Sequence, residues 1–387
     1  MKNDIYLASK PRYEILDGLR GVAALMVVAY HLLETYFHGG PGQPLNHGYL
    51  AVDFFFALSG FVIGYAYDDR WGRMSLLDFA KRRLIRLHPM VILGSVIGAA
   101  LFYFGDCSTF PLINGTPWYV LLLIMLWTFT MVPLPAGMDI RGWAETNPLN
   151  GPVWSLQWEY LANALYALFV RRLSKAALGV CVAVFACLTV ILCLDIDVTG
   201  FLAARSYAAY TVVGGWCTTP DQLQVGLTRL LYPFFCGLLI SRMGWRLGVR
   251  RGFGVCALLV VALLAMPWMG LSPSGDGRWT NGLYEALCIL VGFPVIIMIG
   301  AGSSVGGKTA ALNKFLGEVS YPLYITHYPF VYMQMSWAES HQDLPVATHV
   351  IVAVGLLVLA VLVAYASLKV YDLPVRAWLR GKLFATK

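Results

Sequence analysis

The stretch that decides the fold runs from Val346 to Leu368 and reads VATHVIVAVGLLVLAVLVAYASL, without one Asp, Glu, Lys or Arg. A helix needs about 20 mostly apolar residues to cross the hydrocarbon core of a bilayer, and this run is long enough. The runs Ala177–Leu194 and Val255–Met266 are similarly poor in charge. Of the 387 residues 58% are hydrophobic and 13% are charged, whereas a soluble domain carries about 25% charged residues. The sequence therefore predicts an all-α, polytopic membrane bundle.

Lysine and arginine gather at the ends of the apolar segments, and cytoplasmic loops carry such an excess of positive charge. Placing the basic clusters on one side predicts about ten transmembrane helices with both termini in the cytoplasm. The expected spans are Ile15–Phe37, Gly48–Tyr67, Pro89–Gly105, Pro152–Val170, Ala176–Leu194, Gln224–Ile240, Gly252–Gly270, Asn281–Gly300, Phe315–Met335 and Val346–Leu368.

One further apolar segment, Trp118–Val132, breaks this alternation if it crosses the membrane, because Arg171, Arg172 and Lys175 would then lie outside. The segment is short and lies between Pro117 and Pro133. Irregular backbone is tolerated at membrane depth where protein or a watery cavity satisfies it. We therefore predict a re-entrant or interfacial segment on the external side.

The chain is expected to form a single membrane domain over residues 1–387: a cytoplasmic segment 1–14, the bundle 15–368 and a basic cytoplasmic tail 369–387. The mixed charges of the first fourteen residues and the lack of a small-residue cleavage site argue against a cleaved signal peptide. The net charge of +7 reflects the loop clusters and is not the pattern of a nucleic-acid surface.

Most of the eight cysteines lie within apolar segments, where a thiol behaves as a small hydrophobe. They show no metal-ligand spacing, so no metal is expected. Cys107 and Cys217 fall in predicted loops and would pair only if both loops face an oxidising compartment. Unpaired thiols are the default expectation.

Ionisable side chains within spans are costly and usually face a functional cavity. Arg20 and His31 lie eleven positions apart on the first helix, which separates them by about 16 Å and three turns on nearly the same face. Arg20 is expected near the cytoplasmic end, and His31 deep, toward the external half. A lone intramembrane histidine can also be a packing residue.

Glu159, about two turns into the fourth predicted crossing, is expected at the depth of His31. A carboxylate that hydrogen-bonds to His31 would fix its tautomer and make it a better general base. The alternative roles for Glu159 are a helix cap or the partner of an arginine. Asp53 would either line the same cavity, or cap its helix or neutralise an arginine. Asp53, Trp154 and Ser155 are the candidate substrate-binding residues.

Arg83 and Arg86 lie three positions apart at the start of the third helix and share a face. Two guanidiniums suit bidentate contact with phosphate oxygens. The alternative is a basic loop that only sets topology.

Five motifs occur in order along the chain and together resemble the acyltransferase family 3 of membrane O-acyltransferases. They are Leu16-Asp17-Gly18-Leu19-Arg20-Gly21 with His31; Asp53-Phe54-Phe55-Phe56-Ala57-Leu58-Ser59-Gly60; Arg83 with Arg86; Pro152-Val153-Trp154-Ser155-Leu156 with Glu159; and Ser320-Tyr321-Pro322-Leu323-Tyr324-Ile325-Thr326-His327.

The resemblance implies transfer of an acyl group, usually acetyl, from cytoplasmic acyl-coenzyme A to a hydroxyl of a sugar or related acceptor in the bacterial inner membrane. It makes His31 the catalytic histidine, Glu159 its acidic partner, and Arg20, Arg83 and Arg86 donor-binding residues. Gln157 and Trp158 stand where many members have a small and a second acidic residue. The role of His327 stays open.

The function expected from the sequence is therefore O-acetylation of an envelope or exported glycan or glycolipid by acetyl-CoA. Acylation of a sugar on a secondary metabolite or lipid-linked intermediate is the alternative acceptor. Two other classes remain: a secondary transporter, which inverted repeats and broken helices would favour, and a non-catalytic lipid-binding scaffold. No feature predicts an oligomeric state.

Overall fold

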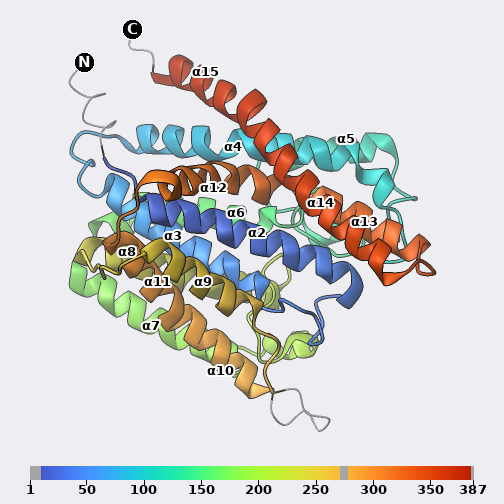
Figure 1. Ribbon diagram of the computed structural model, residues 1–387, viewed down its shortest axis with the longest axis horizontal. Coiled ribbons are helices and arrows are strands. Elements are labelled where there is room, and N and C mark those ends of the chain that lie inside the picture. The colour runs from blue at the N-terminus through green and yellow to red at the C-terminus, as the bar shows by residue number, and fades with distance from the viewer. Residues whose placement is uncertain (1–9, 271–277, 385–387) are drawn as a thin grey trace.

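The computed structural model describes residues 10–270 and 278–384, and the described chain is helical throughout, without strands. Most of its helices run roughly along one direction as a bundle (Figure 1). Helix α2 begins and helix α15 ends at the same end of this bundle (Figure 1). We call it the basic end, and we call the opposite end, where α2 stops at Phe37, the far end. The predicted terminal segments lie partly outside the described residues, at 1–9 and 385–387.

The longer elements, in chain order, are α2 (Glu14–Phe37), α3 (Ala51–Tyr67), α4 (Leu76–Ala100), α5 (Trp118–Thr128), α6 (Val153–Leu168), α7 (Lys175–Cys193), α8 (Pro220–Met243), α9 (Gly252–Ala265), α10 (Trp279–Leu287), α11 (Phe293–Gly302), α12 (Gly307–Thr326), α13 (Tyr328–Ser340), α14 (Val346–Ala366) and α15 (Leu373–Phe384). The short 3-10 helices are η1 (Gly48–Leu50), η2 (Phe102–Gly105), η3 (Ala136–Met138), η4 (Val170–Arg172) and η5 (Leu202–Ala208). Two π-helical segments, η6 (Cys288–Gly292) and η7 (Ser367–Asp372), join α10 to α11 and α14 to α15 without a break.

Seven helices of the described chain are long and apolar enough to cross a membrane, by length and composition. The all-helical, multi-pass architecture predicted from the sequence is thus confirmed, but the expected count of about ten is not. The helices α5 and α9, with 11 and 14 residues, are shorter than the roughly 20 residues that a crossing needs. Few apolar side chains of α7 and α14 are buried, and most are at least partly exposed, which fits contact with lipid.

The third predicted span differs from the structure at its start. Helix α4 begins at Leu76, well before Pro89, because Ser75 caps it: the Ser75 hydroxyl accepts the amide proton of Asp78, and the Asp78 carboxylate accepts that of Ser75. Pro89 lies inside the helix. Arg83 and Arg86 therefore lie within a helix of the bundle, more than one turn after its start.

The predicted span Phe315–Met335 is not one continuous helix. Helix α12 ends at Thr326 and α13 begins at Tyr328, with His327 at the junction and Pro329 in the first turn of α13. Pro329 suits a helix start because proline has no N–H to donate and the first turn has no acceptor for one.

Close helix pairs are built on glycine. Helix α3 packs along α8, where Gly60 meets the backbone of Phe234 and Gly237 meets that of Ala57. A β-carbon at either glycine would overlap the neighbouring backbone, so small residues set the spacing, as in other membrane helix pairs. Helix α2 packs along α12 in the same way. These pairs hold α2, α3 and α12 around the site described next.

All eight cysteines are free. Cys107 and Cys217, the two in predicted loops, are among them.

Candidate active site

A cavity of about 810 Å³ opens between α2, α3, α4, α6 and α12 at the basic end. Its lining includes eight basic side chains and four acidic ones. The basic ones are Lys10, Arg12, Arg20, Arg70, Arg83, Arg86, Lys314 and Arg376, and the acidic ones are Glu14, Asp17, Glu159 and Glu318. We call this space the basic cavity. It is large enough for a cofactor-sized molecule, and its positive excess favours an anionic one.

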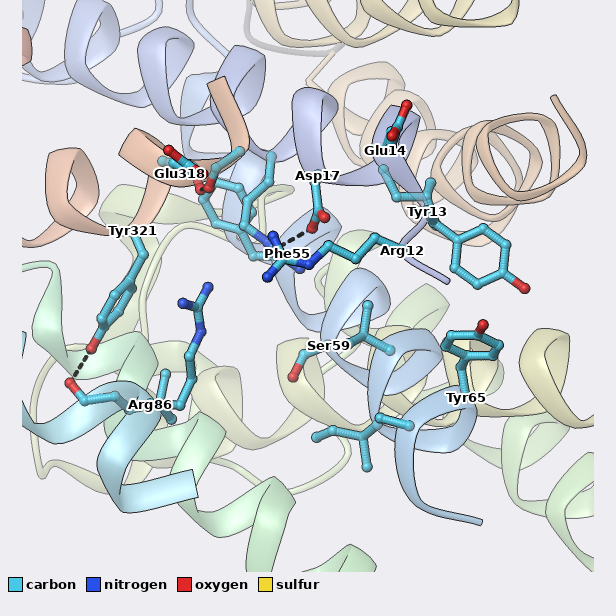
Figure 2. Close-up of a pocket in the computed structure, with 18 of the residues that line it drawn as sticks. Arg12, Tyr13, Glu14, Asp17, Phe55, Ser59, Tyr65, Arg86, Glu318 and Tyr321 are labelled. Atoms are coloured by element: carbon cyan, nitrogen blue, oxygen red, sulfur yellow. Dashed lines mark hydrogen bonds and ion pairs between the residues drawn. The ribbon is translucent and has the colours of Figure 1, made fainter. Parts of the chain in front are cut away.

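Arg86 is one of the basic side chains that line the basic cavity. Figure 2 shows its guanidinium projecting into the open space, and among the described residues it has no hydrogen-bond or ion-pair partner. Arg20, by contrast, lies 3.3 Å from a carboxylate oxygen of Asp17. A guanidinium removed from water without a partner is costly, so Arg86 is a ready site for an anion. The expected donor-binding residues Arg20, Arg83 and Arg86 all line this one cavity.

Glu159 also lines the basic cavity, but the structure does not pair it with His31. Its Oε1 accepts a hydrogen bond from Arg83 Nη2 at 2.7 Å and another from Ser59 Oγ at 3.0 Å. The expectation of a hydrogen bond between Glu159 and His31 is therefore wrong. The alternative of an arginine partner is the arrangement found. Arg83 extends from α4 and pairs with the Glu159 carboxylate, which therefore does not pair with His31 on α2.

His31 has a different carboxylate partner, one turn further along its own helix. Its Nδ1 lies 2.7 Å from Oε2 of Glu34. Since an ionised carboxylate only accepts, Nδ1 carries the proton and Nε2 keeps a free lone pair. The two side chains are 18% and 19% exposed, so solvent reaches this pair. His31 lies six residues, about 9 Å, from the last residue of α2, so this pair is nearer the far end.

A second histidine, His327, stacks on His31 with ring centroids 5.5 Å apart. The Nδ1 of His327 donates to the carbonyl oxygen of Tyr324 at 3.0 Å, which leaves Nε2 as the acceptor nitrogen. This Nε2 is buried and has no partner among the described residues. The break between α12 and α13 thus places a second free imidazole nitrogen beside His31.

The basic cavity stops short of His31. Its inner end is formed by Phe55, Ser155 and Tyr324, and His31 is not part of its lining. Ser155 Oγ and Tyr324 Oη are hydrogen-bonded at 2.7 Å. The Tyr324 ring is 6.1 Å from that of His327. Tyr324 thus borders the basic cavity on one side and lies next to His327, which stacks on His31.

Asp53 and Trp154 do not line the basic cavity. Asp53 is fully buried and forms an ion pair of 2.7 Å with Arg229 of α8, and the Trp154 ring lies 5.2 Å from the same guanidinium. Arg229 also donates to the carbonyl oxygens of Tyr49 and Gly214. Of the alternatives for Asp53, neutralising an arginine is the one the structure shows. Among the three candidate substrate-binding residues, only Ser155 faces the basic cavity.

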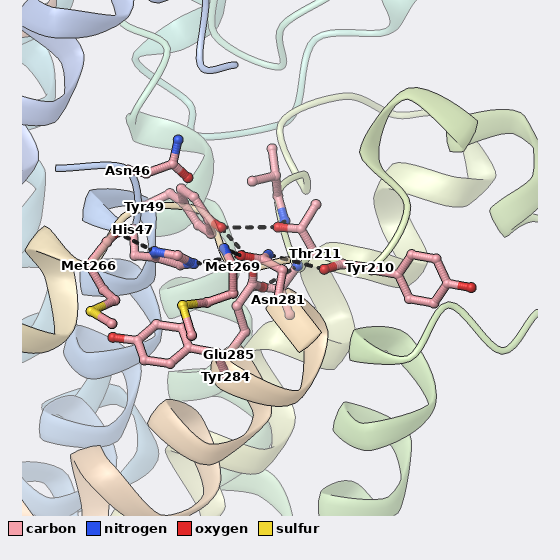
Figure 3. A network of polar contacts seen from close by, with 12 residues as sticks. Asn46, His47, Tyr49, Tyr210, Thr211, Met266, Met269, Asn281, Tyr284 and Glu285 are labelled. Carbon is pink, nitrogen blue, oxygen red and sulfur yellow. Dashed lines mark hydrogen bonds and ion pairs between the residues drawn. The ribbon is translucent and has the colours of Figure 1, made fainter. Parts of the chain in front are cut away.

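A second polar cluster lies toward the far end and is fully buried (Figure 3). Glu285 accepts hydrogen bonds from Tyr49 Oη, from Asn281 Nδ2 and from the Val212 amide, at 2.6 to 2.7 Å. His47 bonds the carbonyl oxygen of Met266 and Oδ1 of Asn281. These hydrogen-bonding groups are paired with protein partners, so we assign this cluster to holding η1, α10 and the 210–213 loop together.

Several residues of the site were absent from the sequence prediction. Glu34 carries a signal that was available, because a carboxylate three positions after a histidine shares its helical face. Arg12, Lys314 and Arg376 carry none, since only the fold brings them to the basic cavity. No group of His, Cys, Asp and Glu in residues 10–270 and 278–384 could hold a metal ion.

Comparison with known proteins places the chain among acyltransferases. The family model Acyl_transf_3, described as an acyltransferase domain, matches residues 13–369. The chain is 28% identical to the acyltransferase MdmB of Streptomyces mycarofaciens, over 82% of the chain and 78% of MdmB. It is 34% identical to protein 2 in the picA locus of Rhizobium radiobacter, over 42% of the chain and 84% of that protein.

Two longer relatives are named as O-acetyltransferases. OatA of Staphylococcus aureus is 24% identical over 95% of the chain, which spans 58% of OatA. YrhL of Bacillus subtilis, named as a provisional peptidoglycan O-acetyltransferase, is 23% identical over 93% of the chain, which spans 54% of YrhL. No solved structure matches significantly. Since the family match covers most of the chain, this protein belongs to the acyltransferase 3 family and is an acyltransferase.

Proposed function

We propose that the protein is an O-acetyltransferase that uses acetyl-coenzyme A from the cytoplasm to acetylate a hydroxyl of an envelope or exported glycan. The observation that carries the proposal is the basic cavity, with the unpaired Arg86 inside it. Coenzyme A bears several phosphate charges on a bulky nucleotide, and a long thin pantetheine arm carries its thioester. A cavity of about 810 Å³ that is rich in basic side chains suits that size and charge.

The basic end would then face the cytoplasm of a bacterial inner membrane. This end carries the positively charged segments Arg242–Arg251 and Lys308–Lys314 and helix α15. Cytoplasmic loops carry an excess of lysine and arginine, which supports this orientation. The acceptor would approach His31 from the far end, where the His31 and Glu34 side chains are partly exposed. Donor and acceptor thus enter from opposite sides, and only the thioester has to pass Tyr324.

The chemistry proposed for His31 is general base catalysis. Nε2 takes the proton of the acceptor hydroxyl as the oxygen attacks the thioester carbonyl carbon; the carbon–sulfur bond breaks, and the coenzyme A thiolate leaves and takes up a proton. Glu34 holds the Nδ1 proton and stabilises the imidazolium that forms. Attack by Nε2 itself, with an acetyl-histidine intermediate, uses the same contacts.

Glu159 takes a positioning role in this proposal. It holds Arg83 against the wall of the basic cavity through the bond of 2.7 Å. Arg83 and Arg86 then present two guanidiniums to the phosphates of the donor, with Arg20 on the facing helix.

Names of relatives support a glycan acceptor, since YrhL is named for peptidoglycan and OatA for O-acetylation. The test is mass spectrometry of surface glycans from cells that lack the gene and from cells that express the parent or His31→Ala. The proposal expects O-acetyl groups on a glycan with the parent only. Acetyl groups on a small secreted glycoside and not on the glycan would overturn the acceptor assignment. Glycan acetylation by His31→Ala at the parent level would remove His31 from the chemistry.

A further inference from the structure

The last described helix, α15, contributes a residue to the basic cavity. The family match ends at residue 369, and α15 begins after it, at Leu373. Figure 1 shows α15 lying across the basic end, close to α4. From this helix Arg376 reaches into the lining of the basic cavity. The family resemblance therefore says nothing of Arg376, and its role has to be read from its contacts.

Two contacts fix α15 in place. At its start, Arg376 Nη1 donates to Oδ2 of the buried Asp372 at 2.8 Å. At its end, the Phe384 ring lies 4.6 Å below the guanidinium of Arg82 and 5.9 Å from Lys81 Nζ, both on α4. Cation–π contacts of this kind hold an aromatic ring against a basic helix. Arg376 is thus held in position by its own helix and is not a freely moving surface side chain.

Arg376 and Arg86 both line the basic cavity. Among the charged neighbours of Arg86, Arg376 acts on it most strongly, ahead of Arg20 and Asp372. Arg376 donates one hydrogen bond to Asp372, and its Nε is buried without a partner among the described residues. Two guanidiniums that repel each other, with donors to spare and one shared carboxylate nearby, form a place where an anion relieves the repulsion.

We propose that α15 completes a phosphate-binding subsite, in which Arg376 and Arg86 together hold a phosphate group of the nucleotide part of the donor. The inference rests on the proposed function, because it takes the donor to be a coenzyme A thioester. Planar guanidiniums suit phosphate oxygens, which they can grip with two parallel hydrogen bonds. The subsite recognises the nucleotide and leaves the thioester chemistry to His31.

The experiment compares two donors, acetyl-CoA and S-acetyl-pantetheine, which lacks the nucleotide, on protein reconstituted in proteoliposomes. Arg376→Gln should raise the KM for acetyl-CoA by about tenfold, the loss expected for a hydrogen bond to a charged group. The kinetics with S-acetyl-pantetheine should change by less than twofold. Arg380→Gln, one turn further along α15 and exposed, is the matched control and should change neither.

Because Arg376→Gln leaves Asp372 buried without its partner, the double variant Asp372→Asn with Arg376→Gln removes both charges and repeats the test in a neutral setting. An unchanged KM for acetyl-CoA in both variants overturns the subsite, and so does an equal loss with both donors. The proposed function is judged separately on the parent: if the parent transfers no acetyl group from either donor while coenzyme A still binds in isothermal titration, the proposed function fails and the phosphate site is tested by titrating the variants.

Discussion

Removing Glu34 gives the sharpest test of how His31 is activated. In the structure the carboxylate partner of His31 is Glu34 and not the expected Glu159. Oε2 of Glu34 lies 2.7 Å from His31 Nδ1. The variants Glu34→Ala and Glu34→Gln form a graded pair. Alanine removes the hydrogen bond, and glutamine keeps a neutral one.

The size of the loss follows from that bond. A hydrogen bond to a charged group contributes about 1.5 to 3 kcal/mol, and each 1.4 kcal/mol is about tenfold in rate. Glu34→Ala should therefore lower kcat by about 10- to 100-fold. A neutral hydrogen bond is roughly half as strong, so Glu34→Gln should lower kcat by about three- to tenfold. The KM for the donor should stay the same, because Glu34 lies outside the basic cavity.

The assay is release of coenzyme A from acetyl-CoA by purified protein in proteoliposomes with a glycan acceptor. Glu339→Gln is the control, since it removes a carboxylate that bonds Ser108 and the Thr109 backbone in a loop at the far end. In the His31→Ala background neither Glu34 variant should cost further activity, because residues that act as one unit are not additive. A full kcat in Glu34→Ala, or a rise in donor KM without a change in kcat, would refute this partnership.

Three further predictions concern the framework. Glu159→Gln should lower the melting temperature more than the double variant Arg83→Gln with Glu159→Gln does, because the single change leaves a cation without its partner; equal losses in a thermal-shift assay would contradict the ion pair. Gly60→Ala should destabilise the protein by several degrees, since its β-carbon meets the backbone of α8, whereas Gly179→Ala on α7 has open space around it and should not. Burial raises the pKa of Glu145, in the loop before α6, to about 7. The fold therefore favours the neutral carboxyl, and the stability that it contributes is lost as the pH rises from about 4.5 through 7. Glu145→Gln should flatten the dependence of the melting temperature on pH in this range, and an unchanged slope would count against the buried carboxyl.

The sequence predicted the fold class because hydropathy and charge asymmetry are properties of single segments. It failed on element boundaries where local chemistry overrides hydropathy. The start of α4 depends on the hydrogen bonds between Ser75 and Asp78, which extend a polar stretch into the helix. The interruption at His327 falls inside an apolar run, where hydropathy carries no sign of a break.

For the site, motif positions were enough to group Arg20, Arg83 and Arg86, which all line one cavity at the basic end. Glu159, which was expected at the depth of His31, lines the same cavity. Motif positions did not predict which of these side chains pair with one another. Equal depth in the membrane suggested a bond between Glu159 and His31, but depth does not fix the rotation of a helix about its axis. In the structure Glu159 accepts a hydrogen bond from Arg83.

The most direct test of the central claim is sided transfer of labelled acetyl from acetyl-CoA in proteoliposomes of known orientation, with the glycan acceptor on the opposite side. Acetylated glycan should form only when acetyl-CoA is on the side of the basic cavity. Both His31→Ala and the double variant Arg83→Gln with Arg86→Gln should reduce its formation strongly. The double arginine variant should keep its activity with S-acetyl-pantetheine. Transfer that proceeds equally from either side, or that survives His31→Ala, would contradict the account.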